Sequence, residues 1–185
     1  MNTFKTIAID PGTSTIGVSI FTINAIDLSI VDIETVLIDL NIGFIEIDLV
    51  DNLLNRLYRL NLRVKELIEY YQPKLVSIEA SFYFKLRPAA YGPLSQSIMA
   101  IELATLYIDP NIRIFKFSPK TIKMIATKGG AANKDDVLSG IANIPEIVNK
   151  INPYLLSEHE VDSLAINYTL LDYIRYNQVI LLMLY

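Results

Sequence analysis

The sequence lacks cysteine, which excludes disulfide bonds and thiolate metal sites and suits a reducing compartment. Long apolar runs are also missing near both ends. The longest, Val179–Tyr185, is far shorter than the roughly 20 residues that a membrane-spanning helix requires. No signal peptide is indicated, because Met1–Lys5 lead directly into a β-prone run. We therefore expect a soluble cytoplasmic protein.

Internal repeats, low-complexity segments and linkers are likewise missing, so residues 1–185 are predicted to form a single domain. The hydrophobic content of 52% is sufficient for a sizeable core. Three consecutive strands are predicted at 4–10, 15–23 and 28–39, with the short connections of an antiparallel meander. The apolar spacing then changes to three and four, which predicts a helix over 47–71.

The later elements are predicted from their caps and their periodicity. In order they are strand 75–79, loop 80–92, helix 93–107, strand 113–117, a helix opened by Ser118-Pro119, a short helix from Asn133 to Ile141, and a last helix from Ser157 to about Tyr176. This order indicates an α/β fold with a mixed sheet and helices on both faces.

Basic residues are few, and the net charge of −4 argues against a typical DNA-binding module. Their distribution argues for one, because residues 113–134 contain six basic side chains and no acid. We interpret this stretch as a contact for a polyanion. A second basic cluster, formed by Arg56, Arg59, Arg63 and Lys65, is interpreted as a solvated helix face.

Asp10 ends the first predicted strand, directly before the turn Pro11–Ser14. A carboxylate at the end of a core strand must be solvated, paired or bound to a metal ion. Taken alone, the stretch leaves two interpretations equally open, a first metal ligand or a cap of the turn.

Three later side chains favour the metal ligand. Glu79 ends another short buried strand, and His159 and Asp162 lie three residues apart on one face of the last helix. Ser157 and Glu160 fit a capping box, so Glu160 has a structural role. Because the ends of central strands form one crevice in an α/β sheet, a helix start laid across it would bring four ligands together.

Three carboxylates and an imidazole suit Mg²⁺ or Mn²⁺ better than zinc or calcium. Two such ions, about 3.5–4 Å apart, can activate a water molecule and stabilise the leaving oxygen of a phosphodiester. The set Asp10, Glu79, His159 and Asp162 is therefore predicted to be both catalytic and metal-binding, with in-line phosphodiester hydrolysis as the reaction.

The segments Ile9–Gly12, Ile78–Phe82 and His159–Ile166 resemble, in order and spacing, the motifs of RuvC-type Holliday junction resolvases, which belong to the RNase H-like (retroviral-integrase-like) nuclease superfamily. The resemblance implies an RNase H-like fold with a five-stranded mixed sheet whose first three strands are antiparallel. It also implies a homodimeric endonuclease of DNA recombination and repair. Such an enzyme nicks two strands across a four-way junction and leaves 5′-phosphate ends. We expect a phage-type member, in bacterial or phage-infected host cytoplasm.

The predicted DNA-binding residues come from two segments. Aromatic and basic side chains alternate in the loop 80–92, which suits stacking on bases, although the loop could equally fold over its own core. By the resemblance, Phe82 matches an aromatic residue near the junction centre, and Lys123 and Lys134 match phosphate contacts. The full predicted set is Phe82, Lys85, Arg87, Lys120, Lys123, Lys128 and Lys134.

Two features depart from the family pattern. Many members carry Asp where this chain has His159, and a pI of about 5.0 is unusual for a resolvase. The turn after Asp10 also resembles the first phosphate loop of actin-like and sugar-kinase ATPases, but these need two such domains around the nucleotide. A third alternative is a non-catalytic DNA-binding module of the same fold. Forks and flaps remain open as substrates beside four-way junctions.

Overall fold

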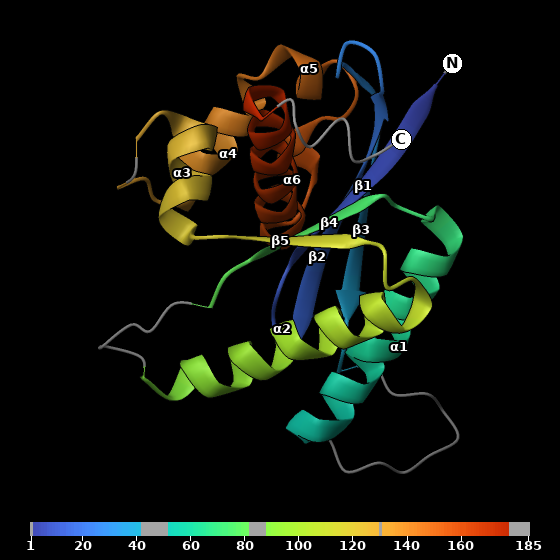
Figure 1. The fold of residues 1–185 in the computed structure, drawn as a ribbon. Helices are drawn as coiled ribbons and strands as arrows, with labels where there is room; N and C mark the ends of the chain where they lie inside the picture. The colour runs from blue at the N-terminus through green and yellow to red at the C-terminus, as the bar shows by residue number, and fades with distance from the viewer. Residues whose placement is uncertain (1, 42–51, 82–87, 130, 178–185) are drawn as a thin grey trace.

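Five β-strands pair into one sheet in the order β3-β2-β1-β4-β5 (Figure 1). The structure is a computed structural model that describes residues 2–41, 52–81, 88–129 and 131–177. The strands are β1 (Thr3–Asp10), β2 (Thr15–Asn24), β3 (Ile30–Asp39), β4 (Leu75–Glu79) and β5 (Arg113–Phe117). β1, β2 and β3 are antiparallel, whereas β4 runs parallel to β1 and to β5, as predicted for an RNase H-like sheet.

Helices cover both faces of the sheet (Figure 1). α1 (Leu53–Tyr71) and α2 (Pro88–Ile108) pack together on one face. The other face carries α3 (Pro119–Thr127), α4 (Lys134–Ala142), α5 (Pro145–Val148), the 3₁₀ helix η1 (Pro153–Leu155) and α6 (Glu158–Tyr176). No helix within the described ranges is both long enough and apolar enough to span a bilayer.

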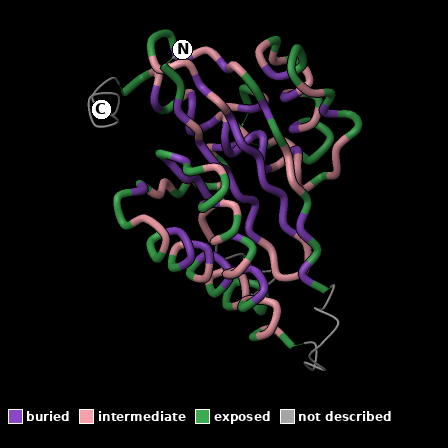
Figure 2. The backbone as a smooth tube through the Cα atoms, turned by 90° about the vertical axis from the view of Figure 1, so that its right-hand side faces the viewer, coloured by how far each residue is buried: buried purple, intermediate pink, exposed green. Residues whose placement is uncertain are grey.

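The sheet separates two apolar cores because successive strand residues point to opposite faces. Along β1, Ile7 and Ile9 pack in the core under α1 and α2, whereas Phe4 and Ala8 pack in the core under α6. Buried residues form nearly continuous runs in β1, β2 and β4, and Figure 2 shows such long buried stretches of extended chain. Asp10 follows the alternation of Phe4 and Ala8 and so faces α6.

Two helix starts differ from the prediction. α1 begins at Leu53, not at 47, because Asn52 is extended and its side chain accepts a hydrogen bond from Asn55 N, as an N-cap does. α2 begins at Pro88, five residues before the predicted start. Proline is tolerated in the first turn of a helix, so Pro88 opens α2 and Pro93 lies inside it.

The interpretation of Arg59 as part of a solvated helix face was wrong. Arg59 is only 7% exposed, and its Nη1 donates a hydrogen bond of 2.7 Å to the Leu40 carbonyl oxygen. This bond ties α1 to the residue that follows β3. Arg63 does lie at the surface, where it forms an ion pair with Glu66.

Candidate active site

The ends of two central parallel strands place Asp10 beside Glu79. Ile9 of β1 pairs with Ile78 of β4, so Asp10 and Glu79 are the next residues on adjacent strands, which lie about 4.8 Å apart. Leu75 packs under α6, and Glu79 follows it at even spacing, so Glu79 also points to the α6 face. The predicted meeting of these two carboxylates at one end of the sheet is thus supported by register.

The start of α6 brings a third element to this place. Ser157 caps the helix, and the Glu160 side chain accepts a hydrogen bond from Ser157 N, so the predicted capping box is confirmed. With the first turn fixed in this way, His159 Nδ1 lies 2.8 Å from Asp10 Oδ2. One direct bond therefore joins two predicted ligands that are 149 residues apart in the sequence.

The carboxyl groups of Glu79 and Asp162 respond strongly to this environment. Burial, followed by the nearby charges of Asp10 and Asp162, raises the pKa of Glu79 from 4.5 to about 7. Burial and Asp10 raise the pKa of Asp162 from 3.8 to about 6. The hydrogen bond to Asp10 raises the pKa of His159 above its ordinary value. The four side chains thus share one electrostatic environment, which is what perturbed functional sites display.

Two of the predicted DNA-binding lysines lie close enough to affect this site. Lys123 of α3 and Lys134 of α4 both lower the pKa values of Glu79 and Asp162 through their positive charge. Lys134 also forms an ion pair with Glu158, at the start of α6. Lys123 and Lys134 thus place positive charge beside the carboxylates, although Lys134 is paired with Glu158 and α4 carries Asp135 and Asp136 in its first turn.

Of the other predicted DNA-binding residues, two lie on or next to α3, and three lie outside the residues that the structure describes. Lys120 is exposed in the first turn of α3, and Lys128 is exposed where that helix ends. Lys116, in the same basic stretch, is neutralised by an ion pair with Glu102. Phe82, Lys85 and Arg87 lie outside the described residues, as do the middle of the predicted loop 80–92 (82–87) and the apolar segment Val179–Tyr185.

The predicted ligands do not form a closed metal cluster. Among the residues that the structure describes, no three His, Asp or Glu side chains lie close enough together to hold an ion as they stand. Asp10 uses one carboxylate oxygen in its bond to His159. The donor chemistry still fits a hard cation, because three carboxylates and one imidazole face a common crevice. A cation would offset both the burial and the mutual repulsion that raise the pKa values of Glu79 and Asp162.

A polar network that the sequence did not reveal holds α6 on the sheet. Asn167, fully buried in α6, accepts a hydrogen bond of 2.7 Å from Thr6 Oγ1 and donates one of 3.0 Å to the Ser19 carbonyl oxygen. Ser19 Oγ donates to the Ser163 carbonyl oxygen at 2.8 Å. The partners are 144 to 161 residues apart in the sequence, so only the fold shows that they pair.

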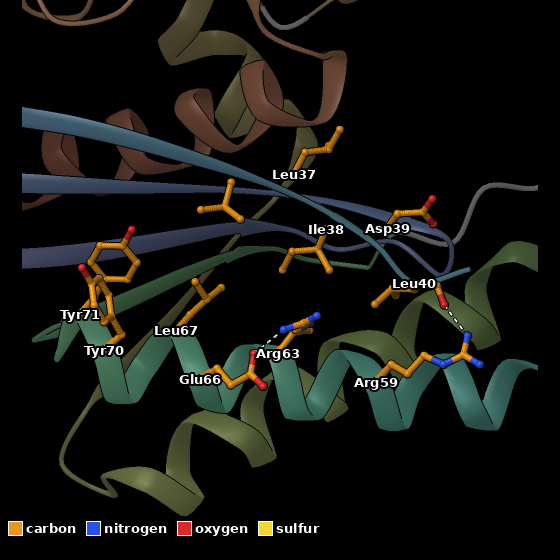
Figure 3. Close-up of a pocket in the computed structure, with 11 residues that line it drawn as sticks. Leu37, Ile38, Asp39, Leu40, Arg59, Arg63, Glu66, Leu67, Tyr70 and Tyr71 are labelled. Atoms are coloured by element: carbon orange, nitrogen blue, oxygen red, sulfur yellow. Dashed lines mark hydrogen bonds and ion pairs between the residues drawn. The ribbon is translucent and has the colours of Figure 1, made fainter. Parts of the chain in front are cut away.

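A cavity of about 700 Å³ lies on the opposite face of the sheet, between the end of β3 and α1 (Figure 3). Asp39, Arg59 and Tyr71 are among the residues that line it, and none of the four predicted ligands does. This cavity is therefore separate from the carboxylate crevice.

The sheet order and the helices on both of its faces are those of an RNase H-like fold. The family model described as "Crossover junction endodeoxyribonuclease RuvC" matches residues 6–170, and the chain belongs to this RuvC family. By family it is a junction-resolving endodeoxyribonuclease, as the motifs predicted. The match favours this prediction over the ATPase alternative.

Known proteins similar to this chain carry the same family name. The RuvC crossover junction endodeoxyribonuclease of Prochlorococcus marinus (strain MIT 9312) is 26% identical over 168 residues, covering 91% of this chain and 96% of that protein. The enzyme of the same name from Endomicrobium trichonymphae is 34% identical over 84 residues, or 44% of this chain and 42% of that protein.

Solved structures confirm the fold. Thermus thermophilus RuvC superposes with a TM-score of 0.71 at 19% identity, covering 94% of this chain and 96% of its own. The same protein in complex with a Holliday junction substrate gives 0.70 at 20% identity, with the same coverage. The yeast mitochondrial Holliday junction resolvase Ydc2 gives 0.62 at 14% identity, over 97% of this chain and 79% of its own.

Proposed function

We propose that this protein hydrolyses phosphodiester bonds in four-way or other branched DNA junctions, in a reaction that depends on a divalent metal ion and leaves 5′-phosphate ends. The observation that carries this proposal is the convergence of Asp10, Glu79, His159 and Asp162 on one crevice, with Lys123 and Lys134 beside it. Its family membership supplies the substrate class. A phage-type origin stays a prediction.

Mg²⁺ or Mn²⁺ is the cofactor that the donor set fits, and two ions per site is our proposal. Asp10, Glu79 and Asp162 would hold it through oxygen atoms, and His159 through an imidazole nitrogen. When bound, such ions supply the activation of water and the charge stabilisation that phosphodiester hydrolysis needs.

The chain's own residues prepare this site in three ways. The bond from His159 to Asp10 orients both side chains before the substrate arrives. Burial of Glu79 and Asp162 strengthens their attraction to a cation, because charges interact more strongly where water is excluded. Lys123 and Lys134 offer positive charge to the DNA backbone next to the carboxylates, which would otherwise repel it.

The DNA surface is proposed to extend from the crevice along α3 and α4. Lys120 and Lys128 expose their side chains on or next to α3, in a stretch without acidic residues. Phosphate contacts of this kind position the substrate without reading its sequence. Phe82, Lys85 and Arg87 remain proposed contributors from the segment between β4 and α2.

A homodimer is proposed from the outer face of α2. Met99, Leu103 and Tyr107 follow one another at spacings of four, so they form a stripe on one side of the helix. Each is more than half exposed, as large apolar side chains at an interaction surface are. Two copies joined here would present two active sites to one junction.

The test is a cleavage assay that compares a four-way junction, a fork and a linear duplex of matched sequence with Mg²⁺ or Mn²⁺. We expect cleavage of the branched substrates, no cleavage with EDTA, and 5′-phosphate products. If the wild-type protein binds junctions but cuts none of them with either ion, the non-catalytic alternative replaces our proposal. Cleavage of the linear duplex at the same rate would contradict the selectivity for branches.

A further inference from the structure

The backbone of β2 runs directly beneath the first turn of α6. Gly17, in β2, pairs with Asp10 in the antiparallel register of β1 and β2. A glycine inside a strand weakens that strand, unless another backbone must approach closely. Here α6 approaches, and it does so at His159.

The space above Gly17 excludes any side chain. A Cβ atom at this position would lie 1.8 Å from the His159 carbonyl oxygen, 2.1 Å from its carbonyl carbon and 2.7 Å from Glu160 N. All three are backbone atoms, so no rotation of a side chain can relieve the overlap. The φ angle of Gly17 is not positive, so close approach, and not backbone conformation, accounts for the glycine.

Neighbouring contacts prevent α6 from sliding to make room. Further along the helix, Ser163 and Asn167 are fastened to Ser19 and Thr6 by the buried network described above. At the first turn itself, Thr35 Oγ1 donates a hydrogen bond of 2.9 Å to Glu160 Oε1. A methyl group at position 17 must therefore lift the first turn while the rest of the helix stays in place.

Such a lift acts directly on the candidate ligands. Moving the His159 carbonyl oxygen from 1.8 Å to an acceptable contact of at least 3.0 Å requires a displacement of 1.2 Å or more, and a hydrogen bond between His159 and Asp10 weakens steeply over that distance. Displacements of this size between reacting groups cost about 100-fold in rate.

We propose that Gly17 is a positioning residue: it lets the first turn of α6 lie against β2, and this close contact, fastened by Thr35 and Glu160, sets the placement of His159 over Asp10. The role extends the proposed nuclease function, because it explains how the crevice is assembled from residues at opposite ends of the chain.

The test compares Gly17→Ala with Gly140→Ala in the whole protein. Gly140→Ala is a matched control, because its Cβ would also meet backbone, at 2.2 Å from the Ala126 carbonyl oxygen, but between α3 and α4. Gly92→Ala, whose Cβ would meet nothing within 4 Å, controls for the exchange itself. The first readout is the NMR signal of the imidazole. His159 is the only histidine, so its signal needs no assignment.

We expect the imidazole signal of Gly17→Ala, recorded without divalent ions, to move to its position in Asp10→Asn, while Gly140→Ala keeps the wild-type signal. At saturating four-way junction, the cleavage rate of Gly17→Ala should fall about 100-fold, with junction affinity unchanged within about threefold. Gly92→Ala should match the wild type in both measurements.

An unchanged imidazole signal, or an unchanged cleavage rate, in folded Gly17→Ala overturns the proposal. If this variant does not fold, Thr35→Val decides, because it removes the bond to Glu160 without adding volume beneath α6. A shifted signal with a slower cleavage rate supports the proposal, and wild-type values for both overturn it. A wild-type protein that cuts no junction contradicts the proposed function instead, and leaves the signal comparison valid.

Discussion

At the scale of single residues, Asp10 contributes both a charge and a direct bond to the site. Replacement of Asp10 by Asn keeps its shape but removes the negative charge that His159 and a cation would meet. We expect Asp10→Asn to abolish cleavage while junction binding in the absence of divalent ions persists. A denaturing gel for products and a native gel for complexes measure the two properties. Asp39→Asn, an exposed carboxylate at the end of β3, serves as control.

If Asp10→Asn cuts junctions at the wild-type rate in Mg²⁺, the assignment of the crevice is wrong. If Asp39→Asn is equally inactive, the loss reflects a general effect on the sheet. Retained binding by both variants is needed for either conclusion.

Glu79 makes folding stability depend on pH. Its pKa is about 7 in the folded protein, above the ordinary 4.5, so the folded state holds the proton more tightly than the unfolded chain does. Its stabilising contribution is therefore complete below about pH 4.5, and it is lost as the pH rises through 7. Asp162, with a pKa of about 6, acts in the same direction.

We expect the melting temperature in EDTA to fall between pH 5 and pH 8, and the fall to be shallower in Glu79→Gln. Thermal unfolding followed by circular dichroism measures both. Glu69→Gln, an exposed glutamate of α1, should keep the wild-type slope. A melting temperature that rises over this range would show that the carboxylates are better stabilised when charged.

Mg²⁺ should raise the melting temperature most near pH 8, since it binds the deprotonated carboxylates.

At the scale of elements, α3 and α4 each place one lysine near the candidate carboxylates. Lys123 and Lys134 belong to different helices, yet both affect Glu79 and Asp162. We expect Lys123→Ala and Lys134→Ala each to weaken junction binding several-fold and to reduce the slope of log affinity against log salt by about 1. Binding titrations at several salt concentrations measure this.

Lys74→Ala is the matched control for these two variants, because Lys74 is exposed next to the opposite end of β4 from Glu79. Its salt slope should equal that of the wild type. Equal slopes in all three variants would show that the DNA does not contact α3 and α4.

The helices and strands also show which parts of the fold could be predicted from the sequence. β4 and β5 have the predicted bounds, because short apolar or alternating runs were enclosed by Pro73 and Ser118. The capping box of Ser157 and Glu160 and the spacing of His159 and Asp162 placed the candidate ligands on α6, since local rules determine both. The burial of Arg59 could not be predicted, because its partner is a carbonyl group 19 residues away.

The starts of α1 and α2 were missed for related reasons. An apolar pattern continued upstream of the Asn52 cap, and Pro93 suggested a start that Pro88 already provides. A glycine inside a strand is the one sign in the sequence that another backbone approaches Gly17. That this backbone belongs to α6 could be known only from the fold.

At the scale of the whole molecule, α2 turns an apolar stripe to the outside. We expect the wild-type protein to be a dimer and Leu103→Glu to be a monomer, because a charge in the middle of an apolar interface is costly to bury. Light scattering after gel filtration measures the mass. Leu155→Glu changes an equally apolar and even more exposed side chain, 81% against 59%, and should remain dimeric. A wild-type monomer, or dimers in both variants, would contradict an interface on α2.

The direct bond between residue 10 and residue 159 has a consequence for synthesis of the protein. A ribosome completes β1 well before α6, so a nascent polypeptide lacks His159 and Asp162, half of the candidate ligands, until α6 is made. We therefore expect the site to be complete only after α6 has been synthesised. Prematurely terminated products that end before α6 would therefore lack these two ligands, and we expect them not to cut DNA.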